Sequence, residues 1–140
     1  MKDLYENVEV AQPVHPQSHT SGALNGTGVN CQGFETLTVV VNIGAITASS
    51  NYSLTVKLQE SSDDGSTDAY ADITGATTPT VLNAGQNEPY IIEVNLSEVE
   101  QYVRPVVTAG SSSGGLVGVT FLLSNPREAP VTQVNTVVTV

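Results

Sequence analysis

The side chains in this sequence that could carry out chemistry are few and widely spaced. His15 and His19 have the spacing of two metal ligands on one helix face, but Pro16 lies between them and breaks a helix. We expect both histidines to be solvated loop residues. The single cysteine, Cys31, has no Lys, Arg or His beside it to lower the pKa of its thiol, so we expect a small, half-buried residue. These residues predict no catalytic site and no cofactor.

The densest group of carboxylates is Asp63, Asp64, Asp68 and Asp72. Carboxylate oxygens are the ligands that Ca²⁺ prefers, so this group is the best candidate for a metal site. The spacing does not follow the EF-hand pattern, and Asp64 followed by Gly65 is typical of a hairpin turn. We interpret the group as a solvated turn without a metal, and Ca²⁺ binding by Asp63, Asp64 and Asp68 remains the alternative.

Cations are rare, with 4 Lys and Arg against 14 Asp and Glu and a formal net charge of −10. Lys57 alternates with apolar neighbours and is expected to be solvated; a covalent crosslink to an Asn, assisted by Glu35, is a minor alternative. Arg104 is expected to bind a carboxylate, and Arg127, which stands between two prolines, to hold the exit of the C-terminal segment. The acidic balance excludes a phosphate-tracking nucleic-acid binder, and no apolar run approaches the length of a membrane span.

The segments that would position these residues read as β-strands. Val and Thr dominate the composition, and their β-branched side chains suit a pleated surface. Alternating apolar and polar residues predict strands over 34–43, 52–59, 70–73, 78–82, 90–96, 102–108 and 116–124. Tyr52 and Tyr90 fall on the inward side of their strands, and Ser97 is expected to cap a single helical turn over 97–101. The pattern predicts an all-β fold, an antiparallel β-sandwich or a jelly-roll-like barrel.

The two ends of the chain differ from this core. Val8 and Val10 alternate with Glu9, which indicates one short strand, but the prolines and glycines that follow in residues 1–33 predict an extended N-terminal arm without further regular structure. A core over 34–130 follows. Residues 131–140 form an uncharged, strand-forming tail that must pair either with an edge of its own sheets or with another chain. The candidate interface with another subunit or another protein comprises Tyr5, Val8, Val10, Arg127, Val131, Val134, Val137 and Val138.

Three segments of the sequence form a recognisable order. They are Leu54–Thr67, with its Gln-Glu-Ser-Ser-Asp-Asp-Gly-Ser turn, then Gln101–Val107 with Tyr-Val-Arg, and Leu122–Pro130 with Pro-Arg-Glu-Ala-Pro. Together they resemble small β-sandwich head decoration, cement or minor capsid proteins of tailed phages. Ala69 and Tyr70 depart from the large aromatic residue that the resemblance implies directly after Asp68. The resemblance implies a non-enzymatic virion protein on the outer capsid surface. Such a protein binds the major capsid protein and other copies of itself, most readily as a trimer.

The N-terminus lacks the apolar run of a secretory signal, which predicts synthesis in the host cytoplasm. The alternative function is a tail-associated or surface glycan-binding β-sandwich module. The absence of Trp and the small number of aromatic residues disfavour this alternative and also a glycosidase. An enzyme of any class is the least favoured interpretation, since no constellation of catalytic residues is present in the sequence.

Overall fold

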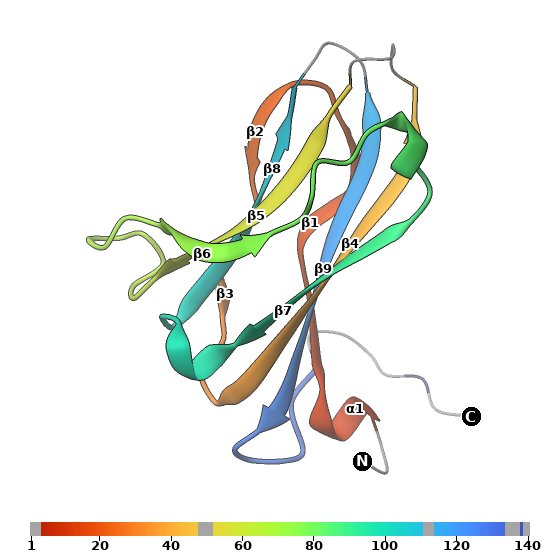
Figure 1. Cartoon of the computed structure of the whole chain (residues 1–140). Coiled ribbons are helices and arrows are strands. Elements are labelled where there is room, and N and C mark those ends of the chain that lie inside the picture. The colour runs from red at the N-terminus through yellow and green to blue at the C-terminus, as the bar shows by residue number, and fades with distance from the viewer. Residues whose placement is uncertain (1–3, 48–51, 111–113, 134–137, 139–140) are drawn as a thin grey trace.

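Two antiparallel sheets pack face to face in the computed structural model (Figure 1), which describes residues 4–47, 52–110, 114–133 and 138. The four-stranded sheet has the strand order β1-β9-β4-β7. The five-stranded sheet has the order β2-β8-β5-β6, and the short strand β3 also pairs with β8. The prediction of an all-β sandwich is therefore confirmed.

Most of the chain is in strands, and the helices are single turns. The elements are α1 (Leu4–Asn7), β1 (Glu9–His19), β2 (Gly22–Asn25), β3 (Val29–Asn30), β4 (Phe34–Ile46), β5 (Leu54–Ser61), β6 (Ala71–Thr77), the 3₁₀ turn η1 (Asn83–Gly85), β7 (Pro89–Asn95), the 3₁₀ turn η2 (Leu96–Glu98), β8 (Tyr102–Ala109) and β9 (Gly115–Pro126). Among the described residues, no helix is long and apolar enough to cross a membrane.

The core lies between the sheets and follows the alternation that the sequence predicts. Every second residue of β4 points inward, and Leu37, Val39 and Val41 are fully buried. Phe121 of β9 is also fully buried and pairs with Val39 across the two strands. Tyr52 is fully buried, with its hydroxyl donating to the carbonyl of His19 at 2.9 Å, which satisfies the one polar atom that this ring brings into the core.

The prediction that residues 1–33 contain no regular structure beyond one short strand is wrong. Strand β1 contains Pro13 and Pro16 and pairs with β9, and its register shifts at the two positions where these prolines lie. Because β1 is at the edge of its sheet, one side of the strand needs no N–H donors, and bulges accommodate the rings. The division of the chain at residues 33 and 130 remains a prediction, but three strands before residue 33 belong to the two sheets.

Three smaller expectations also differ from the structure. The strand expected over 70–73 is present but longer, as β6, whereas the strand expected over 78–82 is reduced to a single bridge between Leu54 and Val81. The turn after β7 is the 3₁₀ turn η2, and Asn95 caps it by accepting from the Ser97 backbone N–H at 3.1 Å. Asn takes the cap because its side chain accepts a backbone bond two residues later. The first turn, α1, was not predicted at all.

The two sides of the sandwich are closed to different degrees. At the β1 and β2 side, the backbone N–H of Thr27 donates to the Pro13 carbonyl at 3.0 Å, and that of Gly26 donates to the Pro105 carbonyl at 2.8 Å. These bonds connect the two sheets through the segment between β2 and β3. On the opposite side, β6 and β7 are the last strands of their sheets, and within the described residues they do not pair with each other.

Candidate functional site

The acidic turn after β5 is held by its own backbone. Asp63 accepts hydrogen bonds from the backbone N–H groups of Ser66, Thr67 and Asp68 at 3.0, 2.8 and 3.1 Å, and from the Thr67 hydroxyl. The Thr67 hydroxyl and these N–H donors stabilise the carboxylate and lower the pKa of Asp63 to about 2. The Asp63 carboxylate therefore serves as the acceptor that organises the turn.

The other acidic residues of this region have separate partners. Asp68 accepts from the backbone N–H and the hydroxyl of Ser62, both at 2.9 Å, which lowers its pKa. The pKa of the Glu100 carboxyl is raised, mainly because this group hydrogen bonds to Asp68. Asp72 lies on β6, away from the turn. Within the described ranges, no three His, Cys, Asp or Glu residues are gathered in an arrangement that could hold a metal ion.

We expect Asp63→Asn to lower the melting temperature at pH 7 and to have little effect at pH 2. A carboxylate whose folded pKa is depressed contributes stability above the unfolded aspartate pKa of about 3.9, and loses it as the pH falls toward the folded pKa. Thermal melts of both proteins between pH 2 and pH 7 measure the difference. The exposed Glu128→Gln is the charge-matched control. A Tm difference that persists unchanged at pH 2 contradicts this account.

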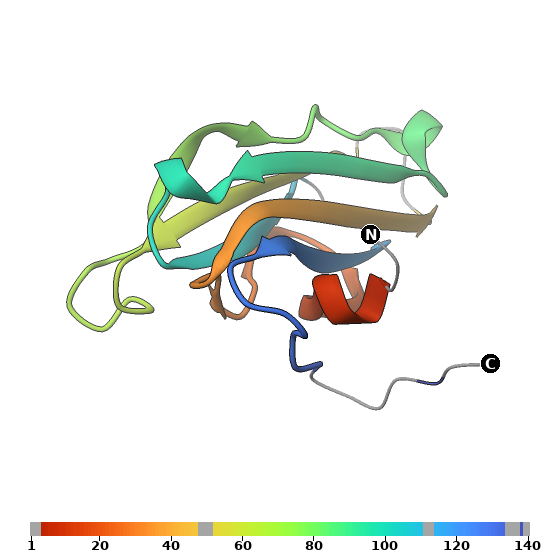
Figure 2. The ribbon, with the colours of Figure 1, turned by 90° about the horizontal axis from the view of Figure 1, so that it is seen from below.

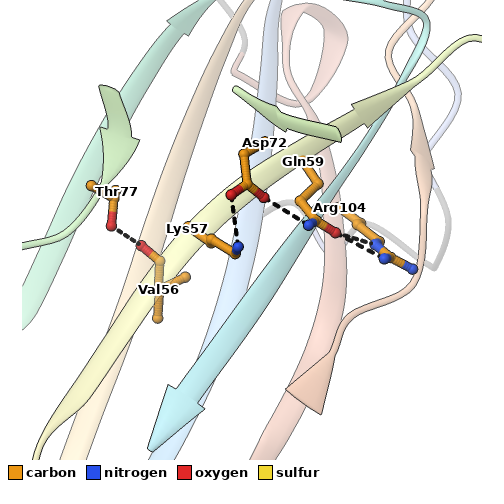
Figure 3. A network of polar contacts seen from close by, with 6 residues as sticks. All are labelled: Val56, Lys57, Gln59, Asp72, Thr77 and Arg104. Atoms are coloured by element: carbon orange, nitrogen blue, oxygen red, sulfur yellow. Dashed lines mark hydrogen bonds and ion pairs between the residues drawn. The ribbon is translucent and has the colours of Figure 1, made fainter. Parts of the chain in front are cut away.

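The outer face of the five-stranded sheet carries a charged network (Figure 3). Lys57 Nζ pairs with Asp72 Oδ2 at 2.8 Å, and Gln59 Nε2 donates to Asp72 Oδ1 at 2.7 Å. Arg104 Nη2 and Nε donate to Gln59 Oε1 at 2.8 and 3.0 Å, and its guanidinium lies 4.1 Å above the centre of the Tyr70 ring. Arg104 therefore binds an amide and an aromatic ring rather than the expected carboxylate.

The network joins the acidic turn to the sheet. The Tyr70 hydroxyl donates to Asp64 Oδ1, and a side chain at Gly28 would collide with both of these groups. Lys57 is paired rather than simply solvated, and it lies on the five-stranded sheet, whereas Glu35 lies on β4 of the other sheet. Glu35 cannot assist a crosslink from Lys57 to an Asn, because Lys57 pairs with Asp72 on the outer face of one sheet while Glu35 lies on the other sheet.

The outer face of the four-stranded sheet is almost free of charge. Its apolar members are Val10, Val40, Ile91, Leu116 and Leu122, separated by threonines, Asn42 and Ser124, and register pairs Val10 with Leu122 and Ile91 with Val40. Ile91 is 67%, Leu116 49% and Val10 45% exposed. Among the described residues of this face, Glu93 is the one Asp, Glu, Lys or Arg.

The first residues of the tail fold back onto the N-terminal segment. Figure 2 shows α1 beside the chain that follows β9. The Val131 N–H donates to the Glu6 carbonyl at 3.0 Å. The Gln133 amide accepts from the Val10 N–H at 3.4 Å and donates to the Tyr5 carbonyl at 2.7 Å and to the Val8 carbonyl. A side-chain amide thus occupies edge groups of β1 that another strand would otherwise bind.

The structure brings several of the predicted interface residues together at this corner. Tyr5, Val10 and Val131 lie around Gln133, and Tyr5 is 41% exposed. Val8 is buried, so its side chain faces the protein interior. Val138 is 82% exposed, while Val134 and Val137 lie outside the described residues. An interface role for these residues remains a prediction.

Arg127 lies close to the same corner. Its backbone N–H donates to the Gly33 carbonyl at 2.8 Å, which fixes the chain as it leaves β9. Its exposed side chain borders two adjoining depressions of about 410 and 130 Å³ that share Gln32 and Phe34. No ion pair joins Arg127 to a carboxylate within the described part of the chain.

The remaining reactive residues have structural surroundings. Cys31 is 4% exposed, and burial raises the pKa of its thiol to about 12, so the thiolate does not form near neutral pH. His15 and His19 lie in β1 rather than in a loop, and His19 Nε2 is 2.8 Å from the Gly22 carbonyl oxygen. Sequence reasoning missed Gln133 and Ile91. Gln133 could have been noticed as an amide in an otherwise β-branched tail, and Ile91 as an apolar residue at an outward strand position.

Neither a protein-family model nor a curated protein matches the sequence. Among solved structures, the chain is similar to VP2 of infectious bursal disease virus in a subviral particle, with a TM-score of 0.51 and 10% identity over 85% of this chain and 32% of VP2. The chain thus spans about a third of the length of VP2. This likeness shows a shared β-sandwich fold.

Two further solved structures are similar over most of their own length. PirA has a TM-score of 0.46 and 12% identity, with 82% of this chain and 95% of PirA covered. A protein of Bacillus endospore appendages, described as a family of disulfide-linked pili, has a TM-score of 0.44 and 9% identity, with 85% of this chain and 89% of that chain covered.

Proposed function

We propose that this protein is a non-enzymatic structural component of a virus particle, a decoration or cement protein on the outer surface of a phage head shell. The observation that carries the proposal is the outer face of the four-stranded sheet. In a chain with a net charge of −10, this face exposes Ile91, Leu116 and Val10, and Glu93 is its one charged residue among those described. A face of this kind supports extended contact with another protein surface.

The charge distribution favours the capsid shell as the main partner. Burying a charged side chain without a partner at an interface is costly, so a nearly uncharged face can be covered at low electrostatic cost. The charged network of Lys57, Asp72 and Arg104 occupies the opposite face, which suits exposure to solvent. We propose that the four-stranded sheet faces the major capsid protein and that other copies of the chain, as a trimer, complete the contact through avidity.

The tail is proposed to pair with a neighbouring subunit. Gln133 already binds the Val10 N–H of β1 and the Val8 carbonyl, so these backbone groups are not free to pair with a strand. Val138, the described residue past Gln133, is 82% exposed. Strand addition by an uncharged, β-branched segment supplies backbone hydrogen bonds to a partner sheet. We retain residues 131–140 as a tail separate from the 34–130 core.

Removal of the tail tests this part of the proposal. We expect deletion of residues 131–140 to abolish co-sedimentation with empty head shells of the same virus and to change the melting temperature by only a few degrees. Deletion of 134–140 is the matched variant, because it keeps the Gln133 contacts with β1. If both shortened chains bind shells like the full chain, the tail has no role in attachment. If they unfold, the tail is an internal strand.

The oligomeric state is measured by light scattering with and without the shells. A monomer or trimer that joins the shells at a fixed ratio supports the capsid role. A chain that ignores the shells contradicts it and favours the glycan-binding module. The structure offers that module little support, because Tyr5 is the one aromatic residue among the exposed large hydrophobic side chains of the described residues.

A further inference from the structure

The open side of the sandwich contains a groove between β6 and β7. Its volume is about 470 Å³, within the usual range of roughly 300–1,000 Å³ for ligand sites. Ile73 and Ala76 of β6 form one wall, and Ile92 and Val94 of β7 form the other. The groove therefore lies between the last strands of the two sheets, with an apolar part in each wall and polar residues such as Thr74 and Asn95 in the rest of its lining.

The groove exists because β6 leaves its partner strand. Lys57 pairs with Thr77 and Gln59 with Asp72, so the four residues 73–76 stand opposite the single residue Leu58. Gly75 allows this wide bulge with a φ of +82°, a conformation that other residues adopt at a cost, and its Cα faces open space. The bulge makes β6 an irregular edge.

Strand β7 is a regular edge by contrast. Its residues pair with β4 without a register shift, from Thr36 with Asn95 to Asn42 with Pro89. In an antiparallel strand the backbone groups point alternately to the two sides, so those turned away from β4 have no strand partner in the described residues. Such an edge can bind an additional strand, and the apolar walls then receive its inward side chains.

Three carboxylates surround the groove and decide which strand fits. Glu93 of β7 and Glu98 of η2 are exposed, and Glu60 of β5 completes the set. No Lys or Arg lines the groove. A second copy of this chain, with a net charge of −10, is a poor match, and the tail over 131–140 carries no charge to pair with these acids. The three carboxylates therefore favour a segment that carries Lys or Arg.

We propose that the groove between β6 and β7 binds an extended, cationic segment of a partner protein, which adds a strand to β7. Its alternating apolar side chains contact Ile73, Ile92 and Val94, and its Lys or Arg residues pair with Glu93 and Glu98. This site shares Glu93 with the outer face of the four-stranded sheet, and its other lining residues lie apart from that face and from the tail. The proposal does not rest on the capsid role.

The probe is a fluorescent, blocked peptide as long as β7 that alternates valine with lysine and threonine. We expect saturable binding by anisotropy, weakened about tenfold in the Glu93→Lys/Glu98→Lys variant. The matched control is Glu35→Lys/Glu88→Lys, which changes the charge equally outside the groove and should alter binding less than about twofold. A peptide with N-methyl groups on alternate residues should not bind, because it lacks backbone donors.

Three results overturn the proposal. Equal binding to the groove variant and to the wild-type chain means that the carboxylates do not select the ligand. Equal binding of the N-methylated peptide means that no strand is added. Tighter binding of a peptide with the sequence of residues 131–140 means that the groove receives this chain's own tail. None of these results bears on shell binding, which is measured separately by co-sedimentation.

Discussion

Ile91→Lys should weaken attachment to head shells by about 100-fold, which corresponds to about 3 kcal/mol. Ile91 is 67% exposed at the centre of the β4–β7 pairing, opposite Val40. If this face meets the shell, a lysine here must either lose its hydration without a partner or force the surfaces apart. The variant should fold normally, because substitutions at exposed positions usually change stability by less than about 0.5 kcal/mol.

The matched control places the same charge on the other sheet. Thr108 is exposed on β8, on the outer face of the five-stranded sheet, opposite Thr55 of β5. We expect Thr108→Lys to bind shells like the wild-type chain when both are measured by co-sedimentation over a range of shell concentrations. Equal loss of binding in both variants would show that net charge, rather than the outer face of the four-stranded sheet, determines attachment.

Phe121→Ala should reduce the free energy of unfolding by about 3–5 kcal/mol. Phe121 is fully buried on β9, where it pairs with Ala11 of β1 on one side and Val39 of β4 on the other. Its removal leaves a cavity between the two sheets that their paired backbones cannot close. Denaturant unfolding measures the loss, and the melting temperature should fall by about 10 °C or more.

The adjacent residue provides the control for this prediction. Leu122 lies on the same strand but points to the outer face, opposite Val10 and Thr38, and is half-buried. We expect Leu122→Ala to cost about 1 kcal/mol of stability but to weaken shell binding, whereas Phe121→Ala keeps the surface that meets the shell. If the two variants lose equal stability, the assignment of inner and outer faces on β9 is wrong.

The alternation of apolar residues was sufficient to predict the sandwich and most of its strands. Along β4, β5 and β9 every second residue is apolar, and the structure buries those residues. This information is local, because side chains on a strand alternate with a period of two wherever the strand lies. The same rule correctly placed Tyr52 inside and Tyr90 partly inside the core.

Local rules failed where pairing partners are distant in the chain. Pro13 and Pro16 argued against a strand, yet β1 pairs with β9 more than a hundred residues later, as in Glu9 with Leu123. The cost of a proline depends on whether its strand is an edge, and edge status is a property of the assembled sheet. Arg104 likewise contacts Gln59 because β5 and β8 pair in a register that places these two residues opposite each other. Its guanidinium also lies over the Tyr70 ring.

An all-β chain, its inward residues, its acidic charge and its uncharged tail follow from the order of residues alone. The folded arrangement was needed to show that the nearly uncharged outward residues fall together on one sheet while Lys57, Asp72 and Arg104 gather on the other. It also decided that β7 remains a regular open edge beside the β6 bulge. Strand order and register assign each outward residue its neighbours, and they follow from long-range pairing that no local period encodes.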